Sequence, residues 1–117
     1  MAEALGMIEC RSFPAMVEAG VELWMRQGPG RTLHSKYLVA DGRFVSVGSY
    51  NLNAYSARLG CEANVQLEHP PLAAELTRFF EAELPHCERV PDADAARAMI
   101  PTDPVAVLCD RWFLNYL

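Results

Sequence analysis

The sequence predicts an α/β domain, an α+β sandwich in which a mixed sheet is flanked by helices. Three observations predict it. Apolar residues recur at helical spacing near both ends, short runs with strand character lie between them, and an Asp-Gly dipeptide joins two of these runs. The length of 117 residues allows one domain with a modest core, and 51% hydrophobic with 21% charged residues is a globular composition.

The first predicted elements are a short helix, a strand and a loop. Ser12 can cap the helix and Gly20 can end it, and three apolar residues between them lie on one helical face: Phe13, Met16 and Val17. Residues 21–25 then have the character of a strand. The glycine- and proline-containing segment 27–31 is predicted to be a loop.

The middle of the chain predicts a hairpin and one more strand. Residues 33–40 and 44–49 are strand candidates, and the Asp-Gly dipeptide at positions 41–42 is a strong hairpin signal. Residues 51–60 are polar and predict an irregular segment. Residues 62–67 alternate between polar and apolar side chains, as expected of a strand.

The C-terminal part predicts two helices and an apolar tail. His69 is expected to be an ordinary loop residue before a helix that runs to Leu84, with a core-facing stripe of Leu72, Leu76, Phe79 and Phe80. Residues 92–100 predict the last helix, and 105–117 form a tail that suits docking or core filling. We therefore expect a half-domain over residues 1–88, followed by a C-terminal helix and tail over 89–117. With about four strands and uncovered outer ones, the domain looks incomplete.

The charge and the cysteines of the chain limit the classes of function that it can have. The net charge is −5, and residues 67–117 hold nine acids against four bases, which argues against a protein that coats phosphate backbones. The four cysteines have no metal-ligand spacing, so we expect free thiols in a reducing compartment and no zinc site. Residues 1–11 lack the pattern of a signal peptide, and no run has the ~20 apolar residues that span a bilayer.

Four polar groups are predicted to gather at one edge of the hairpin. His34 and Lys36 are two residues apart in the first strand, so their side chains share a face, and the second strand brings Ser49 and Asn51 back beside them. An ammonium, a hydroxyl and a carboxamide can hold the oxygens of a phosphodiester. An imidazole can attack phosphorus or protonate a leaving oxygen near neutral pH.

Each of these residues also has a plainer interpretation. His34 and Lys36 alone could be exposed strand residues, and Ser49 and Asn51 could simply end a strand. Asp41 lies in an Asp-Gly turn, so a structural role is as well supported as a catalytic one, and we expect it to organise the turn and the site indirectly. Glu62 could equally be a solvated strand residue.

The spacing resembles the HKD motif of the phospholipase D superfamily, H-x-K-x4-D followed by G-S-x-N. Here it reads His34-Ser-Lys36 with Asp41, then Gly48-Ser49-Tyr-Asn51. The stretch after it is similar to that of bacterial cardiolipin synthases, N-L-D-x-R-S-x3-N-x-E. It matches at Asn51, Leu52, Ser56 and Glu62 and departs from the pattern at Asn53, Tyr55 and Gly60.

The resemblance implies a two-step transfer in which two motifs share one site and no metal or cofactor takes part. One histidine forms a phosphohistidine, and the other protonates the leaving alcohol and then activates water or an acceptor alcohol. It implies that His34 is nucleophile or general acid/base and that Lys36, Ser49 and Asn51 bind phosphate. Glu62 would fix the imidazole tautomer.

Only one motif is present, which leaves several possibilities open. The second motif comes either from a missing N-terminal half, which we favour, or from a second identical chain. The expected reaction is phosphatidyl transfer of the cardiolipin synthase type, with a phospholipid as substrate. A membrane-associated location at the cytoplasmic face of the full-length protein is expected. The alternatives are a homodimeric nuclease or phosphodiesterase, and a non-catalytic fragment that binds phosphate or a partner domain.

Overall fold

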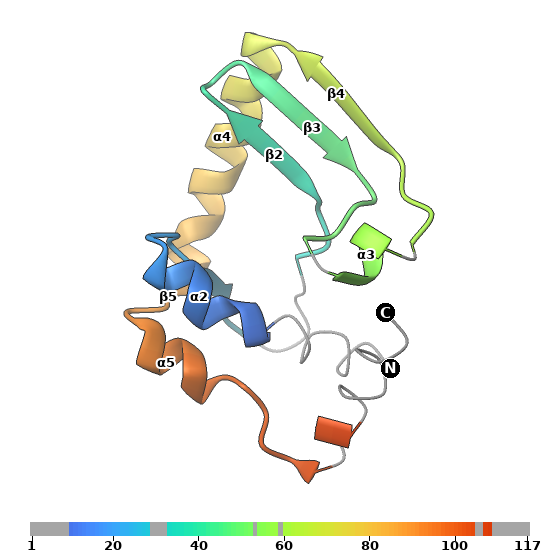
Figure 1. Ribbon diagram of the computed structural model, residues 1–117. Helices are drawn as coiled ribbons and strands as arrows, with labels where there is room; N and C mark the ends of the chain where they lie inside the picture. Colours follow the sequence, from blue (N-terminus) through green and yellow to red (C-terminus); the bar gives the residue numbers. More distant parts are fainter. Residues whose placement is uncertain (1–9, 29–32, 53, 59, 105–106, 109–117) are drawn as a thin grey trace. The chain divides into compact units, whose positions relative to one another are not determined.

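The computed structural model describes residues 10–28, 33–52, 54–58, 60–104 and 107–108 (Figure 1). The chain divides into two compact units. One consists of residues 1–25 with 89–117, and the other of residues 26–88. Helices and two small sheets together make a mixed α+β fold, which confirms the predicted fold class. The predicted division at residues 88 and 89 into half-domain and tail stays a prediction, and most of the tail over 105–117 lies outside the described residues.

In the first unit, the helix α2 (Phe13–Glu18) follows a 3₁₀ turn, Cys10–Ser12. It ends as predicted at Gly20, whose φ is +88°. The amide of Gly20 donates to the carbonyl of Val17 and that of Val21 to Met16, both at 2.9 Å, the bond pair of a Schellman motif. The predicted cap at Ser12 is wrong: Ser12 has helical dihedrals and its side chain makes no capping hydrogen bond.

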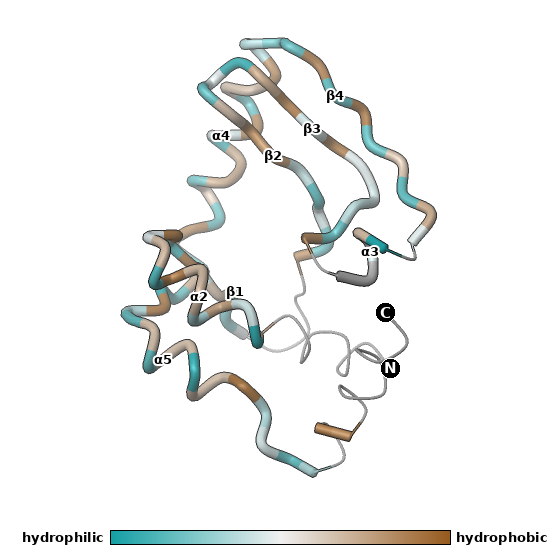
Figure 2. The backbone as a smooth tube through the Cα atoms, viewed as in Figure 1, coloured by the Kyte–Doolittle hydropathy of each residue, from teal (hydrophilic) through white to brown (hydrophobic). Residues whose placement is uncertain are grey.

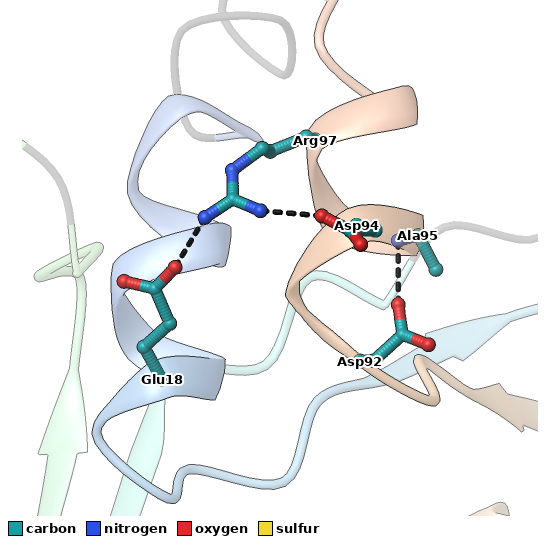
Figure 3. A network of polar contacts seen from close by, with 5 residues as sticks. All are labelled: Glu18, Asp92, Asp94, Ala95 and Arg97. Atoms are coloured by element: carbon teal, nitrogen blue, oxygen red, sulfur yellow. Dashed lines mark hydrogen bonds and ion pairs between the residues drawn. The ribbon is translucent and has the colours of Figure 1, made fainter.

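The helix α5 (Ala93–Ala98) packs against α2. The Asp92 side chain accepts a hydrogen bond from the amide of Ala95 at 2.8 Å and so caps α5. Arg97 joins the two helices, because its guanidinium bonds Asp94 on its own helix and Glu18 on α2 (Figure 3). These charges are exposed, so the packing of the helices carries more of the stability than the ion pairs do.

A two-stranded sheet pairs β1 (Trp24–Arg26) with β5 (Cys87–Arg89). A strand was predicted over residues 21–25, and the observed strand begins later in the chain, at Trp24. The strand β5 was not predicted, because three residues are too few to show an alternating pattern.

The second unit is built on a three-stranded antiparallel sheet (Figure 1). The strands are β2 (Tyr37–Ala40), β3 (Phe44–Gly48) and β4 (Asn64–Glu68), with β3 in the middle. The predicted hairpin is confirmed. Asp41 and Gly42 have φ values of +53° and +63°, as a type I′ turn requires, and the turn closes with a 3.1 Å bond from the Arg43 amide to the Ala40 carbonyl.

The helix α4 (Pro70–Glu83) covers one face of this sheet and is followed by a 3₁₀ turn, Leu84–His86. Phe79 of the helix meets the ring of Tyr37 edge to face, with centroids 6.4 Å apart. His69 is a helix cap and not the ordinary loop residue that was predicted, because its Nδ1 accepts from the Leu72 amide at 3.0 Å. The predicted core stripe is only partly buried, since Phe79 and Phe80 are about half exposed.

Few apolar side chains are buried among the described residues. Those below a tenth exposed are Pro14, Val45, Ala73, Val90 and Ala96. Leu38 and Phe44, on the sheet face opposite α4, are 53% and 44% exposed. Hydrophobic stretches mark the strands β2 and β3 (Figure 2). In the described part of the chain, no helix is both long enough and apolar enough to cross a membrane.

Candidate functional site

Four residues of the motif lie at one end of the three-stranded sheet, where β2 begins, β3 ends and β4 begins (Figure 1): His34, Lys36, Ser49 and Asn51. Antiparallel pairing brings these three chain ends together. The amide of Gly48 donates to the Lys36 carbonyl at 3.1 Å, and Gly48 pairs with Asn64 on its other side. The short helix α3 (Ala54–Arg58) lies in the connection between β3 and β4, where an irregular segment was predicted.

Glu62 is the centre of the hydrogen bonding. One of its oxygens accepts from the Ser49 hydroxyl at 2.5 Å. The hydroxyls of Ser49 and, next in effect, Ser56 lower the pKa of the Glu62 carboxyl, and partial burial opposes them. The ammonium of Lys36 lowers the pKa further. Glu62 is therefore held as a carboxylate.

The Ser49 hydroxyl is fixed from both sides. While it donates to Glu62, it accepts from the amide of Ala63 at 3.0 Å, and the Ser49 amide donates to the Ala63 carbonyl at 3.1 Å. The segment after β3 is thus tied to the segment before β4. A phosphoryl oxygen that approached Ser49 would meet a hydroxyl with a set position.

Ser56 is a residue of this site that the sequence analysis did not assign a role. It is 5% exposed, and its oxygen accepts from the backbone amide of Asn51 at 3.2 Å and from the Asn51 side-chain amide at 3.5 Å. The signal was present, because Ser56 matches the cardiolipin synthase pattern. Residues 51–60 were predicted to be irregular, so the helix α3, in which Ser56 is buried, was not expected.

Asn64 is a second residue that was not singled out. Its carboxamide accepts from the Tyr50 amide and donates to the Ser46 hydroxyl, both at 3.1 Å. It also lies directly over Gly48, where an added Cβ would be 2.3 Å from the Asn64 Oδ1 and 2.2 Å from the Ala63 carbonyl oxygen. Glycine is therefore required at position 48 for a packing reason.

His34 and Lys36 lie before the strand and not within it. The strand β2 begins at Tyr37, so the prediction of a strand over residues 33–40 is wrong at its start. The ammonium of Lys36 donates to the backbone carbonyl of His34 at 2.8 Å. This bond, and not the alternation of a strand, connects the two residues. His34 is exposed, and its imidazole has no hydrogen-bond partner within the described ranges.

Asp41 is not brought to this cluster. It lies in the turn at the other end of the hairpin, roughly 15 Å from Lys36 at ~3.3 Å per strand residue. Any effect of Asp41 on the site must act through the hairpin. The predicted bond from the imidazole of His34 to Glu62 stays a prediction, since the bonds to Glu62 described above come from two hydroxyls.

The arrangement combines groups that suit an anionic ester. The hydroxyl of Ser49 bonds the carboxylate of Glu62, the carboxamide of Asn51 bonds Ser56, and the ammonium of Lys36 bonds the carbonyl of His34, whose imidazole is exposed to solvent. Such a set can hold the oxygens of a phosphodiester while the imidazole exchanges a proton or forms a bond to phosphorus. No cluster of three His, Cys, Asp or Glu side chains fit to hold a metal ion occurs in the described ranges.

Comparison with known proteins agrees with this chemistry. Residues 5–84 match the family model described as cardiolipin synthase, PLD-like domain. The chain is 32% identical over 78 residues to a cardiolipin synthase of Geobacillus kaustophilus, covering 67% of this chain and 15% of the relative. It is 35% identical over 69 residues to that of Oceanobacillus iheyensis, covering 59% and 14%.

A cardiolipin synthase of Clostridium perfringens is 27% identical over 86 residues, 74% of this chain and 18% of the relative. The chain thus spans less than a fifth of the length of these curated relatives. No solved structure matches it significantly. The family match covers more than half of the chain and includes every residue of the candidate site, so the chain belongs to the cardiolipin synthase, phospholipase D-like domain family.

Proposed function

We propose that this chain supplies one of the two motifs of an enzyme that transfers a phosphatidyl group from one phospholipid to the glycerol hydroxyl of another. The observation that carries the proposal is the set of hydrogen bonds at the end of the sheet within the family match: Ser49 donates to Glu62, Asn51 donates to Ser56, and Lys36 donates to the carbonyl of His34. The relatives are cardiolipin synthases by name. The site would work on lipid at the cytoplasmic face of a membrane.

The proposed reaction has two displacements at phosphorus. One imidazole nitrogen forms a P–N bond as the P–O bond to the leaving glycerol breaks, and a second histidine gives that alcohol its proton. The acceptor hydroxyl then loses its proton to the second histidine and forms a new P–O bond as the P–N bond breaks. His34 is one of the two histidines, and its exposed imidazole suits contact with a substrate and a second motif.

The remaining groups stabilise charge in this scheme. Lys36 and Asn51 would bind the non-bridging oxygens, and Ser49 would donate to them when its proton turns from Glu62. Glu62 would hold the hydroxyls in place and offset the charge of Lys36 before substrate arrives. Asp41 would act only through the turn of the hairpin.

A non-catalytic fragment is the second candidate, and one observation favours it. The chain covers only 14–18% of the relatives' length, and a single motif holds one histidine where the reaction needs two. Such a fragment would bind a phosphate group or a partner domain without turnover.

The test uses the full-length protein that contains this chain, with phosphatidylglycerol vesicles and single-stranded DNA as substrates. We expect transfer on the vesicles, and a loss of at least ~10³-fold in His34→Ala. His86→Ala is the matched control, because His86 is exposed and distant in sequence from the motif. Cleavage of DNA with untouched lipid would identify a nuclease instead, and full activity in His34→Ala would refute the proposed role of this site.

A further inference from the structure

The hydroxyl of Ser56 links the two sides of the candidate site. Ser56 is the one polar side chain below a tenth exposed in the described ranges. Asn51 approaches it from the end of the β3 segment, and Glu62 accepts its proton from the start of the β4 segment. The charged carboxylate and the carboxamide are therefore joined through one buried oxygen.

The contacts described for this hydroxyl bring Asn51 and Glu62 to the same oxygen. A serine hydroxyl has one proton to donate and two lone pairs that accept. The proton goes to Glu62, while the two amide donors of Asn51 take the lone pairs at 3.2 Å and 3.5 Å. Because Glu62 and Asn51 share this oxygen, we expect a change at Glu62 to alter the bonds to Asn51.

We propose that Ser56 is a positioning residue that couples the protonation state of Glu62 to the placement of the Asn51 carboxamide. This inference rests on the proposed function, in which Asn51 binds a phosphoryl oxygen. When Glu62 is a carboxylate, Ser56 points its proton at Glu62 and its lone pairs at Asn51. A protonated Glu62 becomes a donor toward the same oxygen, competes for a lone pair and releases one Asn51 amide.

Ser49 provides the matched comparison. It also donates to Glu62, but its oxygen accepts from the backbone of Ala63 and not from Asn51. Removal of either hydroxyl should raise the pKa of Glu62, since both lower it. Only the removal of Ser56 should separate Asn51 from Glu62. A merely structural serine would not produce this difference.

The experiment follows the Glu62 carboxyl and both Asn51 amides by NMR through an acid titration of the 117-residue chain. In the wild type, the Asn51 amides should titrate with Glu62. In Ser49→Ala they should still follow it, at a higher midpoint. In Ser56→Ala the midpoint of Glu62 should rise and the Asn51 amides should no longer follow it. Ser12→Ala, an exposed serine of the other unit, should leave both unchanged.

Ser56→Cys has a side-chain volume close to that of serine. It replaces Ser56→Ala in the titration if Ser56→Ala does not fold. Its weakly bonding thiol should weaken the response of Asn51 to Glu62. The proposal is overturned if the Asn51 amides follow Glu62 equally in the variants of Ser56, or do not follow it in the wild type.

A second readout separates this inference from the proposed function. In the full-length enzyme, Ser56→Ala should lower kcat by about 10- to 100-fold, the range typical of groups that orient contacting residues, and move the acidic limb of the pH profile to higher pH. If His34→Ala were fully active while the NMR coupling held, the proposed function would fail and the role of Ser56 would stand. If kcat and the acidic limb of Ser56→Ala matched the wild type, the inference would fail alone.

Discussion

Among single residues, Gly48 gives the sharpest packing constraint. A methyl group at this position would meet the Ala63 carbonyl and the Asn64 carboxamide at distances that atoms do not adopt. We expect Gly48→Ala to force β3 and β4 apart, to lower the free energy of unfolding by about 1–3 kcal/mol, and to shift the amide signals of Tyr50 and Asn51. Urea unfolding and NMR would measure both effects.

Gly42→Ala is the control for Gly48→Ala. Open space surrounds Gly42, but its φ is +63°. The added methyl should cost about 1 kcal/mol of backbone strain and leave the signals of the site unchanged. Equal shifts of the Asn51 amide in the two variants would show that the packing argument for Gly48 is mistaken.

The lowered pKa of Glu62 predicts how stability depends on pH. Because this pKa is lower in the folded chain than its ordinary value of 4.5, the stabilisation is complete above pH 4.5 and is lost as the pH falls through the folded value. Ser49→Ala removes the largest cause of the shift. We expect Ser49→Ala to unfold at lower urea than the wild type at pH 6, and the difference to narrow at acidic pH to what the lost bond from the Ala63 amide contributes. A gap that widened in acid would contradict the assignment.

The residues of the site could be predicted better than their conformation. The identities and spacing of His34, Lys36, Ser49 and Asn51 pointed to phosphodiester chemistry. Their geometry did not follow from strand alternation, because Lys36 bonds the carbonyl of His34 ahead of β2. Ser56 was missed because its function depends on burial, and a serine in a polar segment gives no sign of burial.

At the scale of elements, α4 depends on an unusual cap. The Nδ1 of His69 accepts from the Leu72 amide, which leaves the helix start with one fewer unpaired donor. We expect His69→Ala to lower the free energy of unfolding by about 1 kcal/mol, and His69→Ser to restore most of it, as followed by circular dichroism in urea. Asp92→Ala at α5 is the parallel case, and a loss there with none at His69 would argue against the cap.

Strong local signals determined which elements could be predicted. The Asp-Gly turn and the glycine at position 20 have positive φ, and the turn of the hairpin and the end of α2 were therefore predicted correctly. The helix α3 and the strand β5 were missed, because five and three residues carry too little periodicity. The stripe on α4 had the right spacing, yet burial depends on what covers Phe79 and Phe80 and not on the helix itself.

At the scale of the whole molecule, the chain buries little for its composition. More than half of its residues are hydrophobic, but the buried apolar residues of the described ranges are two alanines, two valines and one proline. Leu38 and Phe44 lie on the face of the three-stranded sheet opposite α4 at 53% and 44% exposed, and Val65 lies on the other face at 67%. Apolar exposure of this extent marks surfaces that contact other protein. It agrees with a chain that contributes one part of a larger fold.

The proposed sharing of motifs within one polypeptide predicts how activity depends on concentration. A site completed within one chain should keep the same specific activity on dilution, whereas a site completed by a second copy should lose activity as the dimer dissociates. We therefore expect the full-length protein to turn over phosphatidylglycerol at a rate per molecule that is constant from micromolar to nanomolar concentration. The 117-residue chain alone should be inactive at every concentration, because one imidazole cannot both hold the phosphoryl group and protonate the leaving alcohol. Sedimentation in parallel would report the oligomeric state. Activity of the 117-residue chain that rose with its dimer fraction would instead place the second histidine on an identical chain.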